Sequence, residues 1–161
     1  MRTKSIFGLF ICISLVLSLS FAQPANAASA EEEVLQVVTN FAKAVSNKDF
    51  DLMSSLYWHS PKVSEFDPVA GYPFLTQGWE ALETFWKDMT LTPNSSNVIY
   101  LYHPQVTMLG DNVAVTTVYQ NIVSTDQTTN TQSTSQLRQT LVVQKINGKW
   151  LIVHGHASAF P

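Results

Sequence analysis

The sequence predicts an α+β domain in which three helices cover one face of a curved antiparallel sheet. Two observations lead to this fold class. Apolar residues recur at helical spacing in the first half of the domain, and the period changes to two after about Asn97. No strand alternates with a helix as it would in a parallel sheet, so the helices and the strands belong to separate layers of one α+β domain.

The first 27 residues are typical of a secretory signal peptide. Two basic residues precede an apolar run from Ile6 to Ala22, and Ala25-Asn26-Ala27 supplies a small-x-small cleavage site. A membrane anchor is the alternative, but polar residues interrupt the run and a processing site follows it. We therefore expect an exported protein, periplasmic or secreted, with no membrane segment after cleavage. The predicted division is 1–27 for the signal peptide and 28–161 for one domain.

Charge and composition restrict the partners of this domain. Without Arg2 and Lys4 the chain keeps seven basic residues against twelve acidic ones, a net charge of about −5 that argues against nucleic acid or an anionic membrane. Cys12 lies in the predicted leader, so the remaining chain has no cysteine and needs no disulfide. The many aromatic residues suit a packed core and a lined pocket.

Three helices are predicted from caps and apolar spacing. Ser29 and Glu32 form a possible capping box for a helix that ends near Ser46. Asp49 is placed to cap a short second helix, and a third begins near Gly78 and ends before Pro93. The apolar faces are Val34, Val38, Phe41 and Val45 in the first helix, Leu52, Met53, Leu56 and Tyr57 in the second, and Trp79, Leu82, Phe85, Trp86 and Met89 in the third.

The segment from Trp58 to Gln77 is predicted to be a long loop that borders a binding site. It holds three prolines and Gly71, and shows no helical period. A short strand is expected around 63–67. Glu65 and Asp67 would then point to the same side of the chain.

Four strands are expected in the second half. They are 97–109, 112–124 and the two halves of a hairpin from Arg138 to Ser158 that turns at Asn147-Gly148. The polar tract 126–135 is interpreted as an exposed link between the two hairpins, with a disordered insertion as the alternative.

Several short motifs together resemble a known superfamily. They are Asn47-Lys48-Asp49-Phe50, Phe66-Asp67-Pro68, Gly78, Met108-Leu109-Gly110-Asp111, Arg138 with Thr140, and Gly148-Lys149-Trp150 followed by Ile152, Val153, His154, His156 and Ser158. The chain resembles the nuclear transport factor two-like superfamily, in particular its SnoaL-like branch and the association domain of calmodulin-dependent kinase II. The resemblance implies a cone-shaped half-barrel with a pocket between helices and sheet, in a dimer or larger ring. The fold hosts ketosteroid isomerase-like enzymes, dehydratases, cyclases and non-catalytic assembly modules.

Arg138 is the sharpest single candidate for a binding residue. A guanidinium in a mainly apolar strand needs carboxylates or water to offset its desolvation. Its candidate partners are Glu65, Asp67, Glu80 and Glu83. It would act either as an anion or carbonyl clamp in the cone or as one half of a structural ion pair.

His154 and His156 lie two residues apart on one strand and therefore point to one side. Such a pair could share a metal, be held by packing and hydrogen bonds, or transfer protons. No further ligand pair with recognisable spacing accompanies them, so we expect neither a metal nor a cofactor.

The turn decides which side of the sheet Arg138 takes. A two-residue Asn147-Gly148 loop pairs Arg138 with Ala157 and separates it from the histidines, whereas a three-residue loop places it opposite His156. Bulges further along could reverse either result. We favour the two-residue loop because the small Gly155 and Ala157 suit a crowded concave side.

Asp67 is the candidate general base, with Arg138 or Tyr57 stabilising a developing oxyanion. The alternative is an ordinary loop carboxylate beside core tyrosines. The candidate ligand-binding residues are Trp79, Tyr100, Tyr102, Arg138, His154 and His156.

Three functions fit these residues. The first is an exported domain that binds a small, partly apolar molecule and self-associates through its sheet. The second is an acid/base enzyme of the isomerase, dehydratase or cyclase type. The third is a non-catalytic oligomerisation or protein-interaction module with a filled cone.

Overall fold

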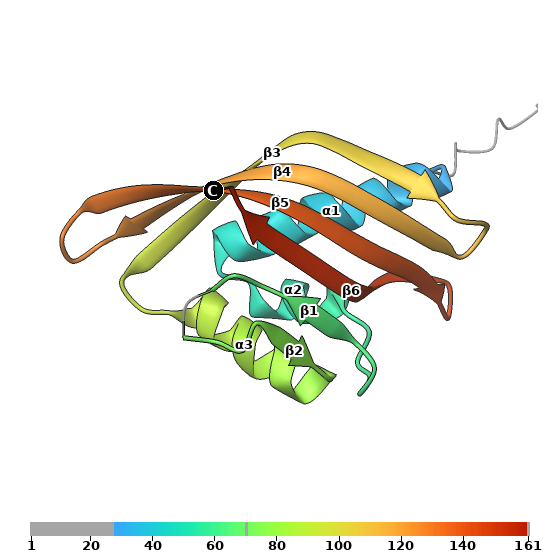
Figure 1. The fold of residues 1–161 in the computed structure, drawn as a ribbon, viewed down its shortest axis with the longest axis horizontal. Helices are drawn as coiled ribbons and strands as arrows, with labels where there is room; N and C mark the ends of the chain where they lie inside the picture. The colour runs from blue at the N-terminus through green and yellow to red at the C-terminus, as the bar shows by residue number, and fades with distance from the viewer. Residues whose placement is uncertain (1–27, 70, 161) are drawn as a thin grey trace, which may run out of the picture.

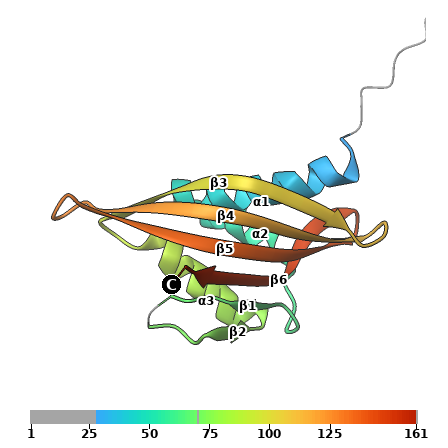
Figure 2. The ribbon, with the colours of Figure 1, turned by 45° about the horizontal axis from the view of Figure 1, so that its top comes forward.

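The computed structural model describes residues 28–69 and 71–160, so the predicted signal peptide lies outside the described residues. Three helices lie against the concave face of one six-stranded sheet (Figure 1; Figure 2). The helices are α1 (Ala30–Asn47), α2 (Phe50–Leu56) and α3 (Trp79–Leu91). The strands are β1 (Ser64–Phe66), β2 (Leu75–Gln77), β3 (Ser95–Met108), β4 (Val113–Asp126), β5 (Thr131–Ile146) and β6 (Lys149–Ala159). The predicted fold class is confirmed.

The helices begin where the caps predict. The Ser29 hydroxyl accepts from the Glu32 backbone N–H, and the Glu32 carboxylate accepts from the Ser29 N–H, which completes the capping box of α1. Asp49 caps α2 by accepting from the Leu52 N–H at 2.9 Å. One apolar stripe of α1, including Val34, Val38 and Phe41, is buried against the sheet.

The strands run in the order β2-β1-β6-β5-β4-β3, and every pairing is antiparallel except that of β1 with β6. Alternate residues of the long strands therefore divide into two faces. The inner face, which meets the helices, carries buried side chains such as Thr116, Val118, Leu141, Val143 and Ile152. We call the opposite side the outer face.

The predicted link 126–135 is much shorter in the structure, because only residues 127–130 form a turn and the rest of this polar tract is strand. β4 and β5 pair without interruption from Val113 opposite Gln144 to Asp126 opposite Thr131. Only a short turn joins them, and the Asp126 carboxylate accepts from the N–H groups of Thr128 and Thr129 there. Threonine has a high strand propensity, which favours this pairing despite the polar composition.

The loop after α2 contains the predicted short strand, β1, and a second strand, β2, that was not predicted. β1 lies parallel to β6, with Ser64 opposite His154, Glu65 opposite Gly155 and Phe66 opposite His156. Because the strand alternates, this register points Glu65 toward the helices.

The closing hairpin has the two-residue turn that we favoured, but Arg138 is not opposite Ala157. Asn147 and Gly148 both have positive φ, and Ile146 pairs with Lys149. A bulge then shifts the register between Val142 and Val143, and Arg138 pairs with Ser158. The extra residue, Val153, turns each later side chain of β6 to the opposite face of the sheet. Arg138, His154 and His156 consequently share the outer face.

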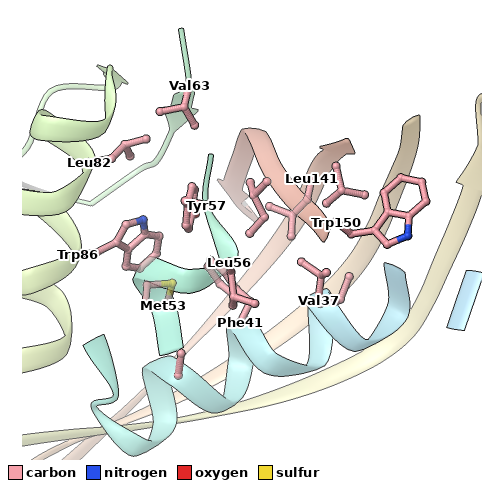
Figure 3. Close-up of a cluster of buried hydrophobic side chains, with 14 of the residues drawn as sticks. Val37, Phe41, Met53, Leu56, Tyr57, Val63, Leu82, Trp86, Leu141 and Trp150 are labelled. Carbon is pink, nitrogen blue, oxygen red and sulfur yellow. The ribbon is translucent and has the colours of Figure 1, made fainter. Parts of the chain in front are cut away.

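The hydrophobic core fills the space between the inner face and the helices (Figure 3). In that view Tyr57 lies between the α3 side chains Leu82 and Trp86 and the sheet residue Leu141. Trp86 makes edge contacts with Phe41 at 5.2 Å and with Phe85 at 4.8 Å between ring centroids. Among the described residues, no helix combines the length and the apolar character that crossing a membrane requires.

Candidate functional site

Glu65 is the central polar group of the interior. Its side chain is only 1% exposed, and its carboxyl group lies next to Gly155 on the neighbouring strand. A Cβ at position 155 would lie 2.8 Å from both Cδ and Oε1 of Glu65. A side chain at position 155 would therefore force the Glu65 carboxyl group to move from its place beside Tyr57.

Tyr57 is the hydrogen-bond partner of Glu65. The Tyr57 hydroxyl donates to Glu65 Oε2 at 2.6 Å, in a fully buried contact. Tyr57 reaches this position because the chain after α2 joins the sheet in a parallel bridge to Ile152. The Trp86 indole N–H lies near the pair and lowers the pKa of both groups, although it does not meet the geometry of a hydrogen bond.

Burial sets the ionisation of this pair. Desolvation raises the pKa of Glu65 to about 8, against the lowering effect of its hydrogen bond with Tyr57, and the nearby Asp67 raises it further. Desolvation also raises the pKa of Tyr57 well above its usual value. Glu65 is therefore mainly neutral at pH 7, which avoids a buried, unpaired carboxylate.

Asp67 follows β1 on the same side as Glu65, as the alternation predicts, and it is less buried. Desolvation raises the pKa of Asp67 to about 6, so this carboxyl group is mainly ionised at pH 7. Glu65 Oε1 and Asp67 Oδ1 are buried and have no hydrogen-bond partner among the described residues.

The interior thus holds two carboxyl groups with different charge states beside a tyrosine hydroxyl. Such a pair can in principle divide the roles of proton donor and acceptor. Glu65, however, is covered by Gly155, Tyr57 and the core around them. Asp67 is the more accessible of the two groups.

The structure brings together two of the three residues predicted to be catalytic. Asp67 and Tyr57 both lie in the interior next to Glu65. Arg138 lies on the outer face, where it donates to the Ala159 carbonyl at 3.2 Å and stacks over Phe160 at 4.9 Å from the ring centroid. None of its four predicted acidic partners forms an ion pair with it among the described residues. A site that combines Asp67 with Arg138 is not present in this fold.

The residues predicted to bind a ligand do not form one site. Tyr100 and Tyr102 are exposed on the outer face of β3. His154 contacts Ser64, with 2.9 Å between Nδ1 and the hydroxyl oxygen, and its pKa is lowered by burial and then by His156. Trp79 stacks on His59 at 3.9 Å between ring centroids, in a surface cleft of about 700 Å³ at the start of α3.

His154 and His156 of β6 pack against an aromatic ring. Across residues 28–69 and 71–160, no group of three or more His, Cys, Asp or Glu side chains is placed to hold a metal ion. Both histidines instead flank the ring of Phe66, with centroid distances of 5.9 and 5.8 Å.

Sequence reasoning did not identify Gly155 and Trp86 as parts of the interior polar site. One signal was available for Gly155, since an isolated glycine inside a strand indicates close approach by another group. Trp86 was correctly expected in the core. Its position beside the Tyr57 and Glu65 pair depends on how α3 packs, which no local pattern specifies.

Comparisons with known proteins agree with this fold. The calcium/calmodulin dependent protein kinase II association domain family matches residues 30–161. A Xanthomonas campestris protein assigned to that association domain is 27% identical, with a TM-score of 0.67, covering 87% of this chain and 93% of its own. The S. rosetta CaMKII hub is 25% identical, with a TM-score of 0.66, and the match covers 83% of this chain and 99% of the hub chain. A Streptomyces avermitilis protein proposed to be an NTF2-like dehydratase shares the fold at 22% identity and a TM-score of 0.69. The match covers 80% of this chain and 95% of that protein.

The contact between Glu65 and Gly155 can be tested by a double-mutant cycle. Gly155→Ala should lower the free energy of unfolding by about 1–3 kcal/mol, because the added methyl group overlaps the carboxyl group. In a Glu65→Ala background the same change should cost almost nothing, since the space is then free. Urea unfolding of the four proteins measures the coupling. Additive costs would show that the two residues do not compete for this space.

Proposed function

Because the chain belongs to the calcium/calmodulin dependent protein kinase II association domain family, we propose that it is a self-associating domain whose copies pair through the outer face of the sheet. One observation carries this proposal. The outer face presents exposed aromatic side chains on neighbouring strands, while the interior is filled by the protein's own core.

The exposed aromatic residues gather on β3, β4 and the chain end beyond β6. Tyr100, Tyr102 and Tyr119 are 51%, 45% and 49% exposed, and Tyr102 lies directly opposite Tyr119. Tyr119 also stacks on Phe160 at 5.9 Å between ring centroids. Val98 adds an exposed apolar side chain on β3. Tyrosine is enriched at protein interfaces because it combines a large apolar surface with a polar tip.

Charge is nearly absent from the same surface. The four long strands contain four charged residues, Asp126, Arg138, Lys145 and Lys149. Lys145 contacts Glu33 of α1 at 2.9 Å, and Asp126 and Lys149 lie at strand ends. Arg138 therefore remains as the charge in the middle of the outer face. Depletion of charge with retention of arginine and tyrosine is the composition of an interface core.

The size of the outer face suits a stable dimer. Four strands spaced by about 4.8 Å, each presenting about 11 residues at about 3.3 Å, give a projected area of roughly 700 Å². A standard interface buries about 800 Å² on each partner. The two-fold contact of one such face with another would also be self-complementary.

Tyr119→Glu should separate the proposed dimer, because it buries a carboxylate without a partner at the centre of the interface. We expect the dissociation constant to rise by at least about 30-fold, which corresponds to about 2 kcal/mol. Sedimentation equilibrium of the mature protein measures the change. Leu91→Glu is the control, since Leu91 is a 58% exposed apolar residue on α3, which lies on the helix side of the sheet. Equal masses for the wild type and Tyr119→Glu would rule out the outer-face dimer.

A second candidate function is the binding of a small, partly apolar molecule at Asp67. It is supported by the buried Asp67 Oδ1 without a hydrogen-bond partner among the described residues, and by the raised pKa of this carboxyl group. An enzyme of the isomerase or dehydratase type would use the same group as a base, with Tyr57 as the nearby hydroxyl. Arg138 has no part in this candidate because it lies on the other side of the sheet.

Native mass spectrometry tests this second candidate. If it is correct, the purified protein retains a small molecule, and Asp67→Asn loses it while Asp88→Asn, a change on the surface of α3, retains it. Absence of any retained molecule from the wild type, or equal retention by both variants, would count against a site at Asp67. Neither result affects the dimer proposal, because Asp67 lies on the inner side.

A further inference from the structure

The first five residues of β5, from Thr131 to Ser135, have an open edge. β5 pairs with β4 from Thr131 onward, but β6 begins its pairing only at Leu137, which lies opposite Ala159. Residues 131–135 are all exposed, so this stretch is held by one neighbouring strand and by no core. Together with β4, which pairs with β3 on its other side as far as Ser95 opposite Asp126, it reaches beyond the helices (Figure 1).

The backbone direction on this open edge follows from one hydrogen bond. The Gln136 carbonyl accepts from the Phe160 N–H at 3.3 Å on the side of β6. Residues of an antiparallel strand direct both backbone groups to alternate sides, so Thr134 and Gln132 also direct their N–H and C=O groups outward. Within the described chain, no strand lies beside these two residues on that side.

The open edge lacks the features that keep strand edges apart. Natural edge strands are protected by lysine, proline, bulges or short length. From Gln127 to Leu137 there is no charged residue and no proline, and the pairing of β4 with β5 contains no bulge. The sequence Thr-Gln-Ser-Thr-Ser instead combines strand-forming threonines with glutamine and serine side chains that can hydrogen-bond across strands.

We propose that residues 131–135 pair antiparallel with the same residues of a second copy of this chain. The edge fits its own copy because it is uncharged, so two copies do not repel each other. An antiparallel pairing of identical strands is also two-fold symmetric. With Ser133 at the two-fold axis, Thr134 of each copy lies opposite Gln132 of the other, and each such pair exchanges two hydrogen bonds. The edge is about 17 Å long.

This contact is separate from the outer-face dimer, since it uses the edge of the sheet and not its face. A subunit with two different two-fold contacts joins more than two copies, in a closed ring or an open chain. The inference therefore extends the proposed self-association from a dimer to a larger assembly. The two contacts can be removed independently.

Thr134→Pro is the direct test. Proline removes the outward N–H but no hydrogen bond to β4, and proline is tolerated where the N–H of an edge strand faces solvent. Thr134→Val is the matched control, because it keeps the N–H and the branched shape. The mass of the mature wild-type protein should exceed two subunits in sedimentation equilibrium. Thr134→Pro should reduce it to two subunits, and Thr134→Val should leave it unchanged. In a Tyr119→Glu background, Thr134→Pro should yield monomers.

Two outcomes would overturn the edge contact. One is a wild-type mass of two subunits or fewer that does not change in Thr134→Pro. The other is a wild-type mass above two subunits that Thr134→Pro does not reduce. Hydrogen exchange gives a second reading that needs no variant. The amides of Gln132 and Thr134 should become protected as the protein concentration rises, and exchange that is independent of concentration would overturn the proposal. Failure of the outer-face dimer would appear differently, as an unchanged mass for Tyr119→Glu.

Discussion

The interior of this domain depends on the contact between the Glu65 carboxyl group and the backbone of Gly155. The parallel pairing of β1 with β6 places the two residues opposite each other, and the missing side chain of Gly155 leaves room for the acid. Tyr57 then satisfies one carboxyl oxygen at 2.6 Å. Burial without a counter-charge keeps this acid mainly neutral at pH 7. Asp67, on the same side of the chain, is left as the ionised neighbour.

The same packing divides the two faces of the sheet into different roles. Inside, Tyr57 and Trp86 fill the space between helices and strands (Figure 3), and the Tyr57 hydroxyl donates to Glu65. Outside, tyrosines and one arginine stand exposed on strands that carry almost no other charge. A family named for association fits a domain that closes its interior and presents its outer face and an uncovered strand edge. The proposed self-association rests on these surfaces.

The sequence predicted the parts of the fold that local rules determine. Ser29 and Asp49 cap helices in the expected places, and Asn147-Gly148 forms the expected turn. The face of Arg138 was predicted incorrectly because a bulge near Val153 inverts the rest of β6, and no residue pattern there indicates it. Most of the tract 126–135 was misassigned because its polar composition resembles a loop, although β4 supplies a partner for each residue from Thr131 to Ser135. The pairing of Glu65 with Gly155 joins distant segments, and only the assembled sheet determines it.

The ionisation of Glu65 gives the most direct test of this account. The folded protein holds the Glu65 proton with a pKa of about 8, against 4.5 for an unperturbed glutamate. The stabilisation from this proton is complete below about pH 4.5 and is lost as the pH rises through 8. Between pH 6 and pH 8 the free energy of unfolding of the wild type should therefore fall by about 2 kcal/mol relative to Glu65→Gln, which cannot ionise. Parallel unfolding curves for the two proteins across this range would contradict a buried, neutral Glu65.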